Sequence, residues 1–385
     1  MIRFRTLLIL LPVAAVSVLG QKAATPPGVE KAFQAFSPDA IRAHIRYLSS
    51  DLLEGRGPGT RGGALAASYI AAQFEAAGLA PAGEDGTYFQ KVSLLGVELD
   101  EPKTSLSFTK NGAAVIGPLK FREEYAGGDQ TQGEASTLDS EIIFVGHGVV
   151  APEAKWDDYK GLDTRGKTLV MLVDDPPASE QEPNLFGGRA RTYYGRWVYK
   201  FEMGTAKNAQ AVILIHTDKA AGYGWNVVRN SWGGENSYVK RAAGAHALSL
   251  AAWVTEKVAR DLFRAAGQDL DALTKAAASR DFQPVPLGLR LQGTVGSKMR
   301  PVETQNVVAK IEGSDPKLKE QAVLYSAHHD HLGIGTPDPK KPSDTIYNGA
   351  IDNASGVATI LEIARVWKQA TPKPKRSILF AAVAA

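Results

Sequence analysis

The chain has 385 residues, and at roughly 150 residues per domain this length predicts two or three domains. Lys and Arg number 44 against 41 Asp and Glu, a near-neutral balance that argues against a nucleic-acid partner or a polybasic membrane contact held by bulk charge. The absence of cysteine excludes disulfide frameworks, thiol nucleophiles and Cys-ligated zinc. Any metal ion must therefore be held by histidine and carboxylate side chains.

Residues 1–20 have the layout of a secretory signal peptide. Two arginines lie among the first five residues, an apolar run follows from Leu7 to Leu19, and small residues precede a cleavage site before Gln21. The alternative is a membrane anchor, but a span needs about 20 apolar residues. This run has 13. We expect an exported protein, periplasmic or extracellular, without a stable membrane anchor.

The mature chain opens with two predicted helices joined by a glycine-rich loop. Ser37-Pro38 has N-cap and first-turn chemistry, and apolar residues at helical spacing predict a helix over 38–49. A second helix is predicted over 64–77, before the capping Gly78. We interpret residues 54–63 as a connection between two packed helices.

The middle of the chain indicates a separately folded module. From residue 93 to 148 the pattern is strand-like, and the region 141–283 mixes short strands with a helix at 256–266. Aromatic clusters such as Trp156-Asp-Asp-Tyr159 are interpreted as core residues. The module is expected to be α/β or mostly β.

Beyond Val285 the pattern is that of a strand–helix–strand unit. The predicted elements are strands at 306–311, 321–327 and 378–385 and a helix at 354–368. Continuous apolar strands predict a buried parallel sheet, in which ligands bind at the carboxyl ends of strands. That rule points to the loops 327–335 and 346–356.

Both loops carry residues capable of metal chemistry. Ala327-His-His-Asp-His-Leu-Gly333 follows a strand, and because alternate strand residues share a face, His328 and Asp330 can point together into a cleft while His329 points away. A carboxylate commonly orients a histidine ligand of zinc. Asp352, in the second loop, can approach the same point and bridge two ions.

Each loop alone has a simpler explanation, a solvated histidine cluster or a helix N-cap. Together, at strand ends of one unit in a cysteine-free chain, they favour a His/carboxylate metal site. The remaining histidines lack such neighbours and are interpreted as structural: His44, His147, His216 and His246.

These motifs resemble a known family. Ala-His328-x-Asp330-His-Leu-Gly, Asn-Gly-Ala-x-Asp352-Asn-Ala-Ser-Gly and Arg376-Ser-Ile-Leu-Phe380 are similar to the co-catalytic di-zinc aminopeptidases of clan MH, family twenty-eight. The segment 47–56 resembles the helix and loop at the start of that family's domain. Val145-Gly-His-Gly148, with Trp156-Asp-Asp-Tyr159 and Gly166-Lys167, resembles the protease-associated domain that many members carry as an insertion.

The resemblance implies an α/β fold, a zinc-exopeptidase-like sheet flanked by helices, with an inserted protease-associated domain of mixed β/α structure. After the signal peptide, the implied domain organisation is an N-terminal part of the peptidase domain at 30–135, the inserted domain at 141–285 and a C-terminal part of the peptidase domain at 295–385.

The resemblance also implies a mechanism. Two zinc ions would share Asp352 as a bridging ligand, His328 would bind one of them, and Asp330 would serve catalysis by orienting His328. The metals would activate a water that attacks the peptide bond. The substrates would be N-termini of peptides or proteins.

The sequence departs from the family at Ala385. In relatives the corresponding strand runs into a Glu-Glu pair, which supplies the general base and a ligand, and two further ligands follow. Of five implied ligands only His328 and Asp352 are present. We therefore expect an incomplete sheet and an N-terminal portion that is inactive alone. The alternatives are a non-catalytic secreted peptide-binding protein and a related di-zinc carboxypeptidase or glutaminyl cyclase.

Overall fold

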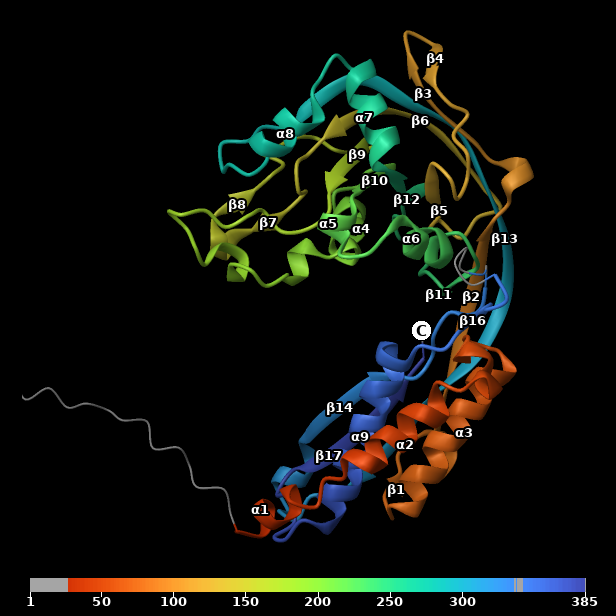
Figure 1. Cartoon of the computed structure of the whole chain (residues 1–385), viewed down its shortest axis with the longest axis vertical. Coiled ribbons are helices and arrows are strands. Elements are labelled where there is room, and N and C mark those ends of the chain that lie inside the picture. Colours follow the sequence, from red (N-terminus) through yellow and green to blue (C-terminus); the bar gives the residue numbers. More distant parts are fainter. Residues whose placement is uncertain (1–26, 336, 338–341, 385) are drawn as a thin grey trace, which may run out of the picture.

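The computed structural model describes residues 27–335, 337 and 342–384. The predicted signal peptide lies outside these residues. Figure 1 shows two bodies joined by long strands. We call residues 27–99 and 297–384 the lower body and residues 100–296 the upper body.

The lower body contains helices and strands from both ends of the chain. Its helices are α1 (Pro27–Phe33), α2 (Pro38–Leu48), α3 (Arg61–Ala76) and α9 (Ser355–Gln369). Its strands are β1 (Ala80–Pro81), β14 (Ala322–His328), β15 (Gly333–Ile334), β16 (Ile346–Tyr347) and β17 (Ser377–Val383). Two strands are associated with both bodies, β2 (Phe89–Leu99) and β13 (Val285–Ile311).

The upper body is formed by the middle of the chain. Its helices are α4 (Trp197–Ala206), α5 (Asp218–Ala221), α6 (Trp225–Trp232), α7 (Glu256–Ala265) and α8 (Leu270–Ala276). Its strands are β3 (Ser105–Lys110), β4 (Ala113–Ile116), β5 (Tyr125–Gly128), β6 (Ala135–Phe144), β7 (Val150–Ala151), β8 (Trp156–Asp157), β9 (Thr168–Leu172), β10 (Ala211–His216), β11 (Asn236–Val239) and β12 (Leu250–Thr255).

The first two long helices begin as capping chemistry predicts. The hydroxyl of Ser37 accepts a hydrogen bond of 3.2 Å from the amide of Ala40, with Pro38 at the first helical position. The next helix, α3, begins three residues earlier than the predicted 64 because Thr60 caps it through the amide of Gly63 at 3.2 Å. A side chain at Gly62 would lie 1.9 Å from the carbonyl oxygen of Leu53, so glycine lets this helix start against the preceding loop.

A single strand, β13, runs through both bodies. On one edge it pairs antiparallel with β3 and then β2, and on the other edge it pairs with β6 and then β17. The boundary expected between the inserted domain and residues 295–385 falls within this strand. The strands β3 and β5, from the segment expected in 30–135, pair with β13 and β12. The proposed domain limits remain predictions.

The upper body is built on parallel strands with helices on both faces. The strands β6, β9, β10 and β12 are parallel neighbours. Leu262 and Phe263 of α7 pack on one face of this sheet, and Phe201 of α4 packs on the other. Trp156 and Tyr159 are buried, as expected for core aromatics.

In the lower body, α2, α3 and α9 share one core with the sheet. Residues Ile378, Phe380 and Ala382 of β17 face this core together with alternate residues of β13. The expected parallel pairing is present between β14 and β17. The expectation that these strands are buried is wrong for β14, whose Leu324 is 59% exposed. The reason is that these helices cover one face, and Leu324 lies on the opposite one.

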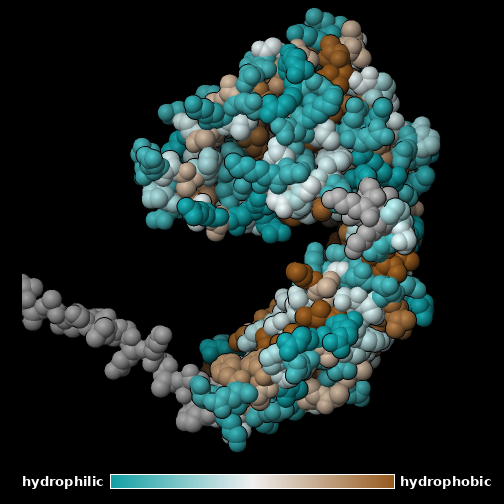
Figure 2. Space-filling view, viewed as in Figure 1, coloured by the Kyte–Doolittle hydropathy of each residue, from teal (hydrophilic) through white to brown (hydrophobic). Residues whose placement is uncertain are grey.

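The two bodies face each other across an open hollow, which Figure 2 shows as a gap in the molecular surface. In the described part of the chain, thirteen strands form one hydrogen-bonded sheet that is parallel in some places and antiparallel in others. Helices flank this sheet in both bodies. The predicted α/β class is confirmed.

The packing of Phe380 gives a first prediction. This ring is fully buried and lies 6.1 Å from the ring of Phe74 and 5.5 Å from that of Tyr325. We expect Phe380→Ala to lower the free energy of unfolding by about 3–5 kcal/mol, because a large cavity forms in the lower core. Urea unfolding followed by circular dichroism measures the change.

The matched control is Leu324→Ala on the neighbouring strand β14. This side chain is exposed, so we expect a change within about 0.5 kcal/mol. A cost for Leu324→Ala equal to that of Phe380→Ala would contradict this description of the lower sheet.

Candidate metal centre

The candidate residues lie where strands of the lower body end. His328 is the last residue of β14, and Asp352 lies in the irregular turn Ala350–Ala354 that opens α9. The carboxyl ends of the parallel strands β14 and β17 point toward the hollow between the bodies (Figure 1). The location agrees with the rule that ligands bind at the carboxyl ends of parallel strands.

The structure brings the three predicted residues together. The Nε2 atom of His328 lies 2.9 Å from Oδ1 of Asp352. The Nδ1 atom lies 3.1 Å from the backbone oxygen of Asp330 and 3.6 Å from its Oδ1. One ring nitrogen therefore meets Asp330, and the other meets Asp352.

Of the two neighbouring histidines, His329 is directed elsewhere. His329 is buried, and its Nε2 lies 3.0 Å from the carbonyl oxygen of Gln305, so it points away from Asp352 as the strand alternation predicts. The amide of His331 donates to the carbonyl oxygen of Arg56 at 3.2 Å. Burial lowers the pKa of both imidazoles.

The donor atoms suit a metal ion such as zinc. An imidazole nitrogen and a carboxylate oxygen are ordinary zinc ligands, and a second carboxylate behind the imidazole is the usual arrangement for orienting it. The side chains of His328 and Asp352 are 41% and 70% exposed, so an ion could reach them. Among the described residues, no group of three or more His, Cys, Asp or Glu side chains is placed to hold a metal. The types of donor atom therefore fit zinc, and the described residues supply one histidine ligand, His328, and one carboxylate ligand, Asp352.

The electrostatics favour a protonated imidazole at this position. Interaction with the side chain of Asp330 is the largest influence and raises the pKa of His328 above 6.5, burial opposes it, and the charge of Asp352 adds to it. A metal ion at Nε2 must displace this proton, so acid is expected to weaken metal binding.

Two residues for which the sequence predicted no role of their own hold the loops of the site. Arg56, which is buried, donates hydrogen bonds to backbone carbonyls of both loops. Asn348 donates from Nδ2 to the carbonyl oxygen of Ser49 at 2.9 Å and to Oδ1 of Asp51 at 2.8 Å. The only sequence feature that could have drawn attention to Arg56 is its place in a glycine-rich loop. The carbonyls that it contacts in the two site loops are far away in the sequence, so the contacts could not be predicted.

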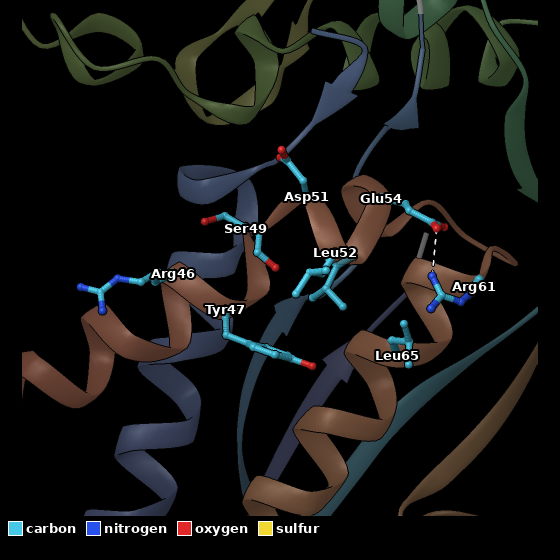
Figure 3. Close-up of a pocket in the computed structure, with 10 residues that line it drawn as sticks. Arg46, Tyr47, Ser49, Asp51, Leu52, Glu54, Arg61 and Leu65 are labelled. Atoms are coloured by element: carbon cyan, nitrogen blue, oxygen red, sulfur yellow. Dashed lines mark hydrogen bonds and ion pairs between the residues drawn. The ribbon is translucent and has the colours of Figure 1, made fainter.

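The segment Asp51–Arg56, which contains Arg56, borders a surface pocket between α2 and α3. In Figure 3, Tyr47, Leu52 and Leu65 lie between these helices, whereas Asp51 and Glu54 lie on the side that faces the upper body. Arg61 pairs with Glu54 at 3.0 Å. The pocket adjoins the site because Asp51 accepts the hydrogen bond from Asn348.

The upper body touches the site through α6. The side chain of Asn230 donates to the hydroxyl of Tyr347, at the end of β16. Tyr347 directly precedes Asn348 and the turn that carries Asp352. The loop that presents Asp352 is therefore held by both bodies.

The remaining histidines have structural partners. Each has a ring nitrogen 2.8–3.1 Å from an oxygen elsewhere in the fold. These pairs are His44 with Tyr69 Oη, His147 with the carbonyl of Asp174, His216 with that of Tyr223 and His246 with that of Ala209.

The fold and site together define an α/β protein with a candidate His/carboxylate metal centre at parallel strand ends. Residues 306–385 match the family model of Peptidase family M28, and this span contains His328, Asp330 and Asp352. The predicted resemblance to this peptidase family is confirmed for that part of the chain.

Several solved structures are similar to the chain. An aminopeptidase from Aneurinibacillus sp. strain AM-1 shares 18% identity with a TM-score of 0.44, over 92% of this chain and 64% of its own. A peptidase M28 precursor from Shewanella amazonensis shares 17% identity with a TM-score of 0.41, over 93% of this chain and 67% of its own. A zinc aminopeptidase from Bacillus subtilis shares 16% identity with a TM-score of 0.34, over 90% of this chain and 61% of its own.

The chain thus spans 64% of the length of the Aneurinibacillus protein and 61% of the Bacillus one. Within the residues that the structure describes, no helix is long and apolar enough to cross a membrane.

Gly55 closely approaches the antiparallel pair of strands β15 and β16, which we call the site hairpin. This contact gives a second prediction. A methyl group at Gly55 would lie 2.4 Å from the carbonyl oxygen of Gly333 and 2.7 Å from that of Tyr347. We expect Gly55→Ala to destabilise the lower body by about 1–3 kcal/mol more than a glycine substitution in open space. Chemical unfolding measures the difference.

Gly86→Ala is the matched control. Its φ of 72° resembles the 69° of Gly55, so both substitutions carry the same backbone penalty, but nothing lies within 4 Å of a side chain at Gly86. Equal costs for the two variants would show that Gly55 is not packed against the hairpin.

The raised pKa of His328 gives a third prediction. In the metal-free protein we expect its NMR titration midpoint to lie above 6.5, and Asp330→Asn to move it downward because the largest stabilising charge is lost. Because the pKa of His328 is higher in the folded protein than in the unfolded chain, protonation of His328 stabilises the fold. This stabilisation is complete below pH 6.5 and is lost as the pH rises through the folded pKa.

The control for this titration is Asp39→Asn, which removes an exposed carboxylate at the start of α2. That variant should leave the midpoint of His328 unchanged. A midpoint in Asp330→Asn equal to that of the wild type would contradict the assigned electrostatics.

Proposed function

We propose that the protein is an exported zinc-dependent aminopeptidase that removes residues from the N-termini of peptides or proteins. The observation that carries the proposal is the 2.9 Å approach of His328 to Asp352, with Asp330 behind the imidazole, inside the span that matches a peptidase family. The candidate signal peptide at residues 1–20 supports export.

His328 and Asp352 would hold the metal, with Asp352 as the ligand shared between two zinc ions. Bound zinc lowers the pKa of a coordinated water and polarises the carbonyl that the water attacks. Asp330 keeps the imidazole of His328 oriented so that Nε2 faces Asp352. Arg56 donates hydrogen bonds to carbonyls of both loops, and Asn348 donates to Ser49 and Asp51.

The described residues supply two of the five ligands that the family resemblance implies. A functional centre on this account needs additional carboxylate and histidine ligands, one of them beside the glutamate that acts as general base. The chain by itself is therefore proposed to be inactive, with activity belonging to a form that includes those ligands.

Residues 141–285, which form most of the upper body, are proposed to be a protease-associated domain that borders the substrate path. Two observations support this role: the hollow between the bodies, and the contact of Asn230 with Tyr347 beside the site. The site loops also expose Leu332, Ile334 and Ile351, which offer apolar contacts to a peptide side chain. Apolar side chains exposed beside polar groups are typical of ligand-binding surfaces.

The test is zinc content and hydrolysis of aminoacyl anilides, measured on the 385-residue chain and on the chain extended along its reading frame. We expect about two zinc ions and activity in the extended form. His328→Ala should lower zinc affinity about 100-fold or more, and Asp330→Asn about 10–100-fold, because one loses a ligand and the other its orienting partner.

His246→Gln is the control, because that exposed histidine lies in the upper body and should leave zinc binding unchanged. Absence of zinc from both forms would overturn the enzyme proposal in favour of a peptide-binding protein. Zinc with cleavage only of C-terminal residues, or with cyclisation of glutaminyl N-termini, would replace aminopeptidase by carboxypeptidase or glutaminyl cyclase. Equal activity of the two forms would refute the proposed inactivity of the 385-residue chain.

A further inference from the structure

The side chain of Arg56 is one of the largest fully buried side chains in the described part of the molecule. It is 1% exposed, although arginine normally lies at the surface. It belongs to the short segment Asp51–Arg56 between α2 and α3. A buried guanidinium carries five donors and a positive charge, so its surroundings must supply acceptors.

Those acceptors come from three separate segments of the chain. The Nε atom donates to the carbonyl oxygen of His329 at 2.8 Å, and the terminal nitrogens donate to those of Asn348 at 2.6 Å and Gly349 at 3.0 Å. A further hydrogen bond reaches the carbonyl of Leu48 near the end of α2. One planar group thus joins the loop after β14, the loop before α9 and the end of α2.

Two of these segments carry the candidate ligands. His329 directly follows His328, and Gly349 lies three residues before Asp352. Burial lowers the pKa of Arg56, and the charges of Asp330 and Asp352 oppose this effect, so the guanidinium also interacts with both site carboxylates. Arg56 therefore interacts with the site both through its charge and through its hydrogen bonds.

The backbone is arranged to direct this side chain inward. Glu54, Gly55 and Arg56 have φ values of 50°, 69° and 53°, a left-handed run that is unfavourable for residues with side chains. The carbonyl oxygen of Arg56 accepts from the amide of His331 at 3.2 Å, so the main chain of this segment also holds the loop after β14.

We propose that Arg56 is the positioning residue of the metal centre: its guanidinium sets the separation between the loop that carries His328 and the loop that carries Asp352. This inference rests on the proposed function. Lysine cannot replace it, because one ammonium group on a flexible stem cannot reach carbonyls in three segments with the fixed geometry of a planar fork.

The test compares Arg56→Lys with wild type in the full chain. In the metal-free protein we expect faster amide hydrogen exchange over residues 346–354 and 329–331, with unchanged exchange in β10 and β12 and in the second half of α9. By competition with a chromogenic chelator, zinc affinity should fall about 10–100-fold, the range found when groups that orient metal ligands are removed. Arg56→Gln, which removes the charge as well, should be at least as impaired.

Arg61→Lys is the matched control. Arg61 lies five residues further along, is 71% exposed and pairs with Glu54, so the same change should leave exchange and zinc affinity unaltered. If Arg56→Gln does not fold, the lysine variant still decides the question.

The possible results separate the two proposals. If neither the 385-residue wild type nor its extended form binds zinc, the proposed function fails, and the exchange comparison alone decides whether Arg56 sets the loops. Wild-type exchange rates in Arg56→Lys would overturn the inference. If wild type binds zinc, an equal zinc affinity in Arg56→Lys would also overturn it. Faster exchange spread evenly over both bodies would do the same, because it would show that Arg56 only stabilises the protein in general.

Discussion

The architecture depends on the continuity of β13. This strand of 27 residues offers two hydrogen-bonding edges, and both bodies use them in succession. Its first half is bound by β3 and β6, and its second half by β2 and β17. Breaking the strand would leave unpaired backbone groups in both halves of the sheet at once, which is costly wherever they are buried. The upper body is therefore attached to the lower body by main-chain hydrogen bonds.

The candidate site lies in the lower body at its side toward this hollow. Parallel pairing of β14 with β17 places His328 at a strand end, and the irregular turn before α9 brings Asp352 to it. Neither loop is rigid by composition. They are held by a buried guanidinium, by Asn348 and by the contact of Asn230 with Tyr347, and these partners belong to three different parts of the chain.

Much of the fold could be predicted locally. The helices at 38–49, 256–266 and 354–368 follow from periodicity and capping, and the structure has them within one or two residues. The length of β13 could not be predicted, because its apolar pattern is interrupted at Pro301 and its partners differ along its course. The exposure of Leu324 was also missed, since an apolar run does not reveal whether a sheet face is covered. Histidine and carboxylate spacing identified the three site residues, but their roles remain predictions.

The sequence by itself determined which groups can do chemistry: with no cysteine, His328, Asp330 and Asp352 were the donors at neighbouring strand ends. Only the tertiary structure decided what holds them. Arg56 contacts carbonyls 273 and 292 residues away, and a backbone carbonyl has no signature in the sequence because every residue has one. The type of each side chain can be read from the sequence, whereas the partners of a buried charge depend on how the whole chain folds.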